Sequence, residues 1–235
     1  LDITGEGDVL YQDKKDSLNY TINKKDGTLN FKSLLEIKSN SFIIDFLNYK
    51  NNENDKTLIY LEGSQNKKNI TLIKSLSLIE NKNKIEVKNL IFNKKFEIIE
   101  LDSVNLDYVD KDKQKNLINF FKRKNTYYLE GPYFNANNLI DNLLFDENDN
   151  SKIFNINNKI VININKIELY NEYYLLNFVG DISYQNKEII KANLTGNFSD
   201  DKKFKFTINS NQDNKITTLY IDKAEPIVRR YKFIK

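Results

Sequence analysis

EYYLLNFVGDISY (172–184) is the first of four stretches that decide the fold; EIIKANLTGNF (188–198), KFKFTIN (203–209) and KITTLYID (215–222) follow it. In the first three, apolar residues alternate with polar ones. Successive side chains of a β-strand point to opposite faces, so each stretch has one apolar face and one polar face. The spacers between the stretches consist mostly of residues that favour turns. We therefore expect four antiparallel strands in a meander, with one dry face and one wet face.

The alternate apolar positions of these stretches are the main functional feature of the sequence. They are Leu176, Phe178, Ile182, Tyr184, Ile190, Ala192, Leu194, Phe198, Phe204, Phe206 and Ile208.

The composition limits the classes of function. The chain has 235 residues, with 36 Lys and Arg against 33 Asp and Glu, a formal net charge of +3. Such a balanced charge argues against a protein that binds nucleic acid or an anionic membrane mainly by electrostatic attraction. Because Cys is absent, the chain has neither a disulfide framework nor a thiolate metal site. It also lacks an apolar run long enough to span a membrane.

The rest of the chain predicts further strands separated by polar turns. We expect them at 9–11, 18–22, 29–37, 57–62, 70–79, 84–92, 96–109 (with a bend at 102–103), 117–122, 127–130 and 153–170. Asp26-Gly27 predicts a tight hairpin turn. The stretch 41–49 is apolar on both sides and fits either a covered strand or a short helix. In 153–170 the apolar residues change from even-numbered to odd-numbered positions near Lys166, which predicts a bulge.

One segment has helical spacing. Leu139, Ile140, Leu143 and Leu144 form one stripe, and Asn135 is the expected N-cap. The strands do not alternate with helices, so nothing in the sequence predicts a parallel sheet.

Catalytic and metal-binding patterns are weak. The sequence has no His, and carboxylates such as Glu100 and Asp102, or Asp107, Asp110 and Asp112, are typical of solvated turns in so charged a chain. The segment 146–151 resembles the start of a calcium loop, but Ser151 and Asn157 replace the glycine and the bidentate glutamate. We expect no catalytic site, cofactor or metal.

Three parts of the sequence, two of which overlap the four stretches quoted above, resemble the periplasmic β-rich region of AsmA-like proteins. This family includes the YhdP-type bridge-like lipid transfer proteins. The three parts are GPYFNANNLIDNLL (131–144), ANLTGNFS (192–199) with FKFTI (204–208), and TLYIDKAEPIVRRYKF (218–233). The resemblance covers the second half of the chain better than the first. Glu225-Pro226 departs from the small residues of the family pattern.

The resemblance implies an elongated, twisted antiparallel sheet that curls into an open apolar groove, with one or two short helices. The chain would be one segment of a larger protein, with a β meander at 1–130, a short amphipathic helix at 131–145, a second meander at 146–222 and the start of a terminal helix at 223–235. It would have no enzymatic activity.

The family also implies the partner and the location. The groove would hold phospholipid acyl chains on the alternate apolar residues named above, Ala192 excepted. The protein would lie in the periplasm of a Gram-negative envelope, anchored in the inner membrane by a segment outside this chain, and would carry lipid toward the outer membrane. From the alternation alone, an alternative stays open: a surface or adhesion module whose apolar faces close into a sandwich core.

Overall fold

The fold is mainly β and is divided into two units. A computed structural model describes residues 1–11, 13–138, 158–170, 173–185, 188–198, 200–210 and 214–225. Contacts between Cα atoms separate residues 1–114 (unit 1) from residues 115–235 (unit 2). The boundary after Gln114 has no counterpart in the sequence interpretation, which treated 1–130 as one meander.

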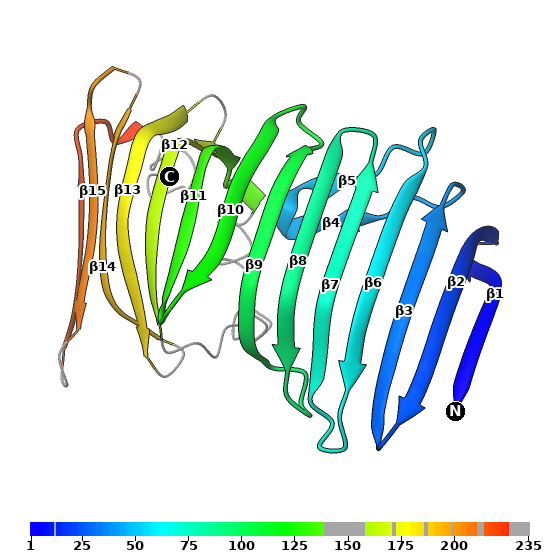
Figure 1. Ribbon diagram of the computed structural model, residues 1–235. Helices are drawn as coiled ribbons and strands as arrows, with labels where there is room; N and C mark the ends of the chain where they lie inside the picture. Colours follow the sequence, from blue (N-terminus) through cyan, green and yellow to red (C-terminus); the bar gives the residue numbers. More distant parts are fainter. Residues whose placement is uncertain are drawn as a thin grey trace. The chain divides into compact units, whose positions relative to one another are not determined.

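Unit 1 is an antiparallel sheet in which each strand pairs with the next one along the chain, except that β4 and β5 are set aside (Figure 1). Its strands are β1 (Asp2–Tyr11), β2 (Lys14–Lys25), β3 (Thr28–Ile37), β6 (Thr57–Gln65), β7 (Thr71–Glu80), β8 (Asn83–Phe92) and β9 (Ile98–Val109). Every predicted strand in this part of the chain is present, and most are longer than the pattern indicated.

The turns of unit 1 use residues that tolerate a positive φ. Asp26 and Gly27 have φ angles of 51° and 78°, which confirms the tight hairpin between β2 and β3. Asn81, with φ of 51°, turns the chain between β7 and β8.

The ambiguous stretch 41–49 is neither a single strand nor a single helix. It contains β4 (Ile43–Ile44), the short 3₁₀ helix η1 (Asp45–Leu47) and the first residue of β5 (Tyr49–Lys50). Strands β4 and β5 pair with each other in a small hairpin of their own. This explains why the stretch is apolar on both sides: the hairpin packs on the sheet through Leu47 and Tyr49, while Ile43 and Phe46 are exposed.

Unit 2 contains the predicted four-strand meander at its end. Its strands are β10 (Lys115–Arg123), β11 (Thr126–Asn135), β12 (Lys159–Tyr170), β13 (Tyr173–Gln185), β14 (Glu188–Phe198), β15 (Lys203–Ser210) and β16 (Lys215–Ile221). The pairs β13–β14, β14–β15 and β15–β16 are antiparallel, as expected.

One pair of strands corrects the expectation of a purely antiparallel sheet. β11 and β12 run parallel, with Tyr127 opposite Ile160 and Phe134 opposite Ile167. A parallel pair needs a long crossover connection, and residues 136–158 supply it. Sequence periodicity identifies strands but not their direction, so this pairing was missed.

The expected helices fall largely outside the described residues. Gly131–Asn135 is the end of β11 rather than the start of a helix, and only Asn137 and Asn138 after it are described as helical. Asn135 does accept a hydrogen bond at its Oδ1 from the backbone N–H of Asn137, 3.2 Å away, as an N-cap would. The apolar stripe from Leu139 to Leu144, the segment 146–157 and the segment 226–235 lie outside the described residues.

Candidate functional site

In unit 2, apolar residues of neighbouring strands lie directly opposite one another. Residues paired across strands share a face of the sheet, so each set of partners forms a row at right angles to the strands. One row is Leu129, Ile162, Gly180, Leu194, Phe206 and Leu219, and the next is Tyr127, Ile160, Ile182, Ala192, Ile208 and Thr217. We call the face that carries these rows the unit 2 apolar face.

Eight of the ten predicted binding residues lie on this face. The register places Ile182, Leu194, Phe206 and Ile208 in the two rows, and Phe178, Tyr184, Phe198 and Phe204 beside them. Ile190 falls at a register shift, where Tyr184 lies opposite Ile189 instead, so the register does not place it. The sequence therefore identified which side chains share a face. Their binding role stays a prediction.

Leu176 lies outside this face. Leu175 is completely buried, whereas Leu176 is only half-buried, and both Leu175 and Phe178 lie against Gly196. Because Leu175 and Phe178 are three residues apart, regular alternation would put them on opposite faces. Asn177, between them, has a left-handed φ of 50° and reverses the parity. The candidate site thus contains Leu175 in place of Leu176.

The same reversal explains the parity change predicted near Lys166. In β12, Ile164 pairs with Phe178 and Ile167 pairs with Leu175, and all four are buried. The side chains of β12 and β13 therefore change faces at the same point along the two strands. The pairing of β12 with β13 continues without a shift at Lys166. The register shifts lie elsewhere. They fall between Leu176 and Val179 and between Ser183 and Tyr184 in β13 against β14, and between Glu168 and Tyr170 in β12 against β13.

Burial on this face varies with position. Phe198 and Ala192 are each 2% exposed, while Ile182, Tyr184, Phe204 and Phe206 are only half-buried. The rings of Phe178 and Phe204 lie 6.2 Å apart between centroids. Burial raises the pKa of Tyr184, which keeps its hydroxyl neutral.

The opposite face of unit 2 is polar. Lys166 Nζ lies 4.0 Å from the centroid of the Tyr174 ring, and the hydroxyl of Tyr133 donates a hydrogen bond to Glu168. On the same face of β10 and β11, the guanidinium of Arg123 lies 4.7 Å from the centroid of the Phe121 ring. Lys122 is an exception on the other side, since it lies opposite Tyr127 with its Nζ 5.9 Å from the centroid of that ring.

Unit 1 has an apolar face that the sequence analysis did not propose as a site. One row of direct partners is Leu18, Leu35, Ile59, Leu78, Ile85 and Leu106, and another is Ile22, Phe31, Gly63, Ile73, Leu90 and Leu101. We call the face that carries these rows the unit 1 apolar face. The alternation of Leu29, Phe31, Leu35 and Ile37 was the signal that could have identified it.

The side chains of β8 also change faces within the strand. Ile85 and Val87 lie on one face, but Leu90 rather than Ile91 continues the row of apolar residues. Asn89 has a left-handed φ of 49° and reverses the alternation of side chains in β8, as Asn177 does in β13. Its Nδ2 donates to Asp102 Oδ2 at 2.6 Å, at the position where a bend in β9 was expected.

The β4–β5 hairpin covers one end of the unit 1 apolar face. The hydroxyl of Tyr108 donates to the backbone oxygen of Leu47 at 2.8 Å, and the rings of Tyr49 and Tyr108 meet edge to face, 5.8 Å apart. Beneath the hairpin Leu78, Ile85 and Leu106 are buried. Farther from it most of the apolar side chains are half-buried, and Leu101 is buried. In the described part of unit 1, this hairpin is the only element outside the main sheet.

A buried carboxylate fastens the hairpin to the sheet. Glu80 is 3% exposed and accepts hydrogen bonds from the Tyr49 hydroxyl (2.8 Å), the Asn52 backbone (2.7 Å), the Thr57 hydroxyl (3.1 Å) and the Asn83 amide (3.2 Å). Burial raises the pKa of Tyr49, and its hydrogen bond to Glu80 adds to that effect. The hydrogen bonds satisfy the carboxylate, so it is a structural anchor rather than a free acid or base.

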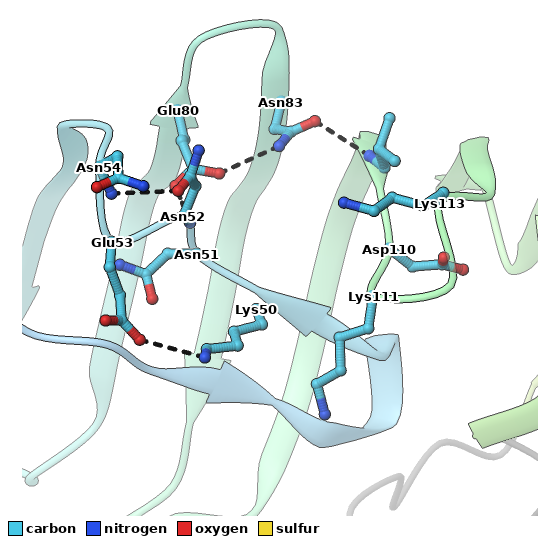
Figure 2. Close-up of a pocket in the computed structure, with 11 residues that line it drawn as sticks. Lys50, Asn51, Asn52, Glu53, Asn54, Glu80, Asn83, Asp110, Lys111 and Lys113 are labelled. Atoms are coloured by element: carbon cyan, nitrogen blue, oxygen red, sulfur yellow. Dashed lines mark hydrogen bonds and ion pairs between the residues drawn. The ribbon is translucent and has the colours of Figure 1, made fainter.

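The cavity above this anchor is polar. It has a volume of about 610 Å³, and Figure 2 shows Lys111 and Lys113 on one side of it and Glu53 and Asn54 on the other. Its charged side chains are mixed in sign, and Lys50 pairs with Glu53 at 3.2 Å. Apolar and aromatic groups dominate most ligand pockets and are scarce in this one. The cavity therefore does not resemble a site for an organic ligand.

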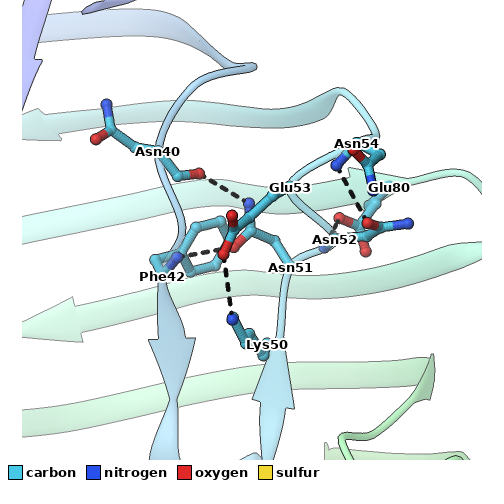
Figure 3. A network of polar contacts seen from close by, with 8 residues as sticks. All are labelled: Asn40, Phe42, Lys50, Asn51, Asn52, Glu53, Asn54 and Glu80. Atoms are coloured by element: carbon cyan, nitrogen blue, oxygen red, sulfur yellow. Dashed lines mark hydrogen bonds and ion pairs between the residues drawn. The ribbon is translucent and has the colours of Figure 1, made fainter. Parts of the chain in front are cut away.

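Amide side chains hold the connections on either side of the hairpin (Figure 3). Asn51 accepts from the backbone of Phe42 at 2.7 Å and donates to the backbone oxygen of Asn40 at 3.1 Å. Asp16 accepts from the Asn40 side chain at 2.7 Å. The polar residues near the hairpin therefore serve to hold the backbone of its connections in place.

The structure adds no support to the weak catalytic and metal-binding patterns of the sequence. Among the described residues, no three Asp, Glu, His or Cys side chains are grouped closely enough to hold a metal ion. Asp110 accepts from the backbone N–H groups of Asp112 and Gln114, both at 2.9 Å, as a turn residue does. The calcium-like segment and the pair Arg229–Arg230 lie outside the described residues.

Comparison with known proteins identifies no relative. No family model, no curated protein and no solved structure matches this chain. In the part of the chain that the structure describes, we find no helix with the length and apolar character of a membrane span.

Proposed function

We propose that this chain is a non-enzymatic segment of a lipid transfer protein, and that its apolar face shelters phospholipid acyl chains as they move between two membranes. The observation that carries the proposal is the register. In each unit, apolar residues lie opposite one another across at least five neighbouring strands, so the rows run across the strands without a polar interruption. A row of this kind is a track along which a hydrocarbon chain can slide.

The energetics require such a track. Each buried methylene group contributes roughly 0.8 kcal/mol, so a sixteen-carbon chain exposed to water costs on the order of 12 kcal/mol. Half-buried side chains such as Phe31, Leu35 and Ile59 offer apolar surface that a tail can cover. Transport along it depends on a continuous apolar surface rather than on individual reactive groups.

The resemblance to AsmA-like proteins supplies the biological setting of the proposal. In that setting the sheet curls into an open groove, and the protein lies in the periplasm, anchored in the inner membrane by a segment outside this chain. The lipid would travel toward the outer membrane.

Site-specific photo-crosslinking tests the proposal directly. A photo-reactive phenylalanine analogue is placed at Phe204 or Phe31 on the apolar faces, or at the adjacent Lys205 or Lys32 on the polar faces, and the protein is irradiated in cells. We expect phospholipid adducts, detected by mass spectrometry, at Phe204 and Phe31 alone. Equal labelling at the lysine positions, or no lipid at any position, would rule out the lipid track.

A second candidate function is favoured by one observation. Leu175, Ile164 and Phe198 are 0%, 1% and 2% exposed, as in the core of a closed domain. A β-rich surface or adhesion module would bury its apolar face in this way.

Single substitutions of Phe178, Leu194 and Phe206 by Asp distinguish the two functions. A lipid track predicts that at least the half-buried Phe206→Asp variant stays folded, by circular dichroism, and loses lipid crosslinking. A closed core predicts that all three variants unfold.

A further inference from the structure

Three turns at one end of the unit 1 sheet each carry two consecutive lysines. They are Lys24-Lys25, the last two residues of β2 before its turn into β3, Lys67-Lys68 between β6 and β7, and Lys94-Lys95 between β8 and β9. We call these six residues the lysine rim. At the opposite end of the sheet, Lys14-Lys15 lies beside the turn between β1 and β2, but Lys15 forms an ion pair with Asp8 at 3.0 Å. The turn between β7 and β8, Asn81-Lys82, has a single lysine.

The antiparallel order brings the three turns together. Leu29 of β3 pairs with Gln65 of β6, and Thr71 of β7 pairs with Phe92 of β8, so the three hairpins end at the same level. Figure 1 shows these turns side by side at the lower end of the unit 1 strands. Strands lie about 4.8 Å apart, which spaces successive hairpins by roughly 10 Å.

The charge of the rim is largely uncompensated. All six lysines are exposed, and none forms an ion pair with another described residue. The acidic residues of these turns are Asp26 and Glu97, and Glu97 accepts a hydrogen bond from Asn93 at 2.7 Å. At the opposite end of the strands, by contrast, acidic and basic residues alternate from Asp110 to Lys113.

The rim borders the unit 1 apolar face. Lys24 pairs with Leu29, and Phe92 pairs with Ile98, so apolar residues reach the last positions before the turns. Phe96, next to Lys95, is 77% exposed. A hydrocarbon tail lying on this face and pointing along a strand would therefore place its polar end among the lysines.

We propose that the lysine rim binds the phosphate of anionic phospholipids whose tails lie on the unit 1 apolar face. This inference rests on the lipid-transfer function proposed above and adds a substrate class to it. The ammonium group of Lys is a compact point charge that binds phosphate without requiring a fixed geometry, which suits a head group that moves from one hairpin to the next. The lysine rim contains no Arg and adjoins an apolar face, and both features favour a lipid over a nucleic acid.

Calorimetric titration with three soluble ligands tests the rim. The ligands are dioctanoyl phosphatidylglycerol, dioctanoylglycerol, which has the same tails without phosphate, and glycerol 3-phosphate, which has the phosphate without tails. The test protein carries Lys25→Gln, Lys67→Gln and Lys94→Gln. A control with the same change in charge carries Lys14→Gln, Lys82→Gln and Lys88→Gln, which are exposed lysines away from the rim.

We expect the rim variant to bind phosphatidylglycerol about tenfold more weakly than the unmodified chain, because three ammonium groups that would lie near the lipid phosphate are lost. Its affinity for dioctanoylglycerol should not change, and the control variant should bind both lipids normally. Added salt should weaken the binding of phosphatidylglycerol alone, since exposed charges are screened over about 8 Å at physiological ionic strength.

The other outcomes separate the two proposals. If the rim and control variants lose phosphatidylglycerol affinity equally, or if neither loses affinity, the rim does not recognise the head group. Binding of dioctanoylglycerol would still support the proposed lipid-transfer function in that case. If no lipid with tails binds, the proposed function fails and the rim proposal fails with it. Glycerol 3-phosphate binding as tightly as phosphatidylglycerol would show an anion site independent of lipid and would overturn the inference.

Discussion

The hydroxyl of Tyr49 lies 2.8 Å from a carboxylate oxygen of Glu80, thirty-one residues away in the sequence, and both side chains are almost completely buried. This contact joins the β4–β5 hairpin to the end of β7. It decides where the unit 1 apolar face is covered and where it stays accessible.

Removing that hydroxyl should destabilise unit 1. Tyr49→Phe leaves the aromatic packing intact but deprives a buried carboxylate of a donor, which costs about 1–3 kcal/mol. Urea unfolding followed by circular dichroism measures the change. Tyr60→Phe, at a ring that is 40% exposed, is the matched control and should leave the midpoint unchanged. Equal midpoints for all three proteins would show that the hairpin is held by other contacts.

Acid should weaken the contact between β2 and the segment after β3. Burial acts to raise the pKa of Asp16, but hydrogen bonds from Lys38, Asn40 and Ser39 outweigh it, so the net pKa is lowered. A carboxyl group with a lowered folded-state pKa stabilises the fold above its unfolded-state pKa, and this stabilisation is lost as the pH falls through the folded-state value.

Asp16→Asn should therefore be less stable than the unmodified chain at neutral pH, and the difference should shrink below about pH 4. Urea unfolding at a series of pH values provides the comparison. A difference independent of pH would contradict a role for the ionised carboxylate.

A bulge in unit 2 requires glycine. A Cβ atom at Gly131 would collide with the backbone oxygen of Leu117 and the Cα of Ile118, beside the register shift between β10 and β11. Because backbone cannot move aside cheaply, Gly131→Ala should destabilise the chain by about 1–3 kcal/mol. Gly7 has open space around it, and Gly7→Ala should be tolerated. Similar thermal midpoints for both variants would disprove the requirement.

The parity reversal in β13 should depend on Asn177. Its φ of 50° lies in the left-handed region, where residues other than Gly and Asn are strained by roughly 1–2 kcal/mol. We expect Asn177→Ala to lower the free energy of unfolding and Asn177→Gly to keep it. Asn193→Ala, on an exposed position of the regular strand β14, serves as the comparison. If Asn177→Ala and Asn193→Ala behave alike, the reversal does not need a special residue.

The sequence could predict the strands and most of the candidate face, because alternation is a local property. Phe204, Phe206 and Ile208 share a face in any strand that contains them, and the Asp26–Gly27 turn follows from the φ angles that these residues tolerate. Leu176 was misassigned because a single left-handed residue reverses every position before it, and Asn occurs too often in this chain to mark that place.

What the sequence by itself determined is therefore the class of fold, the two-faced strands and their turns, all of which depend on residues within a few positions of one another. The tertiary structure alone decided the parallel pairing of β11 with β12, the hairpin that covers one end of the unit 1 apolar face, and the assembly of three distant lysine pairs into one rim. These features depend on which strands become neighbours. That choice is made by the burial of whole faces and by long-range hydrogen bonds, and no short window of sequence records it.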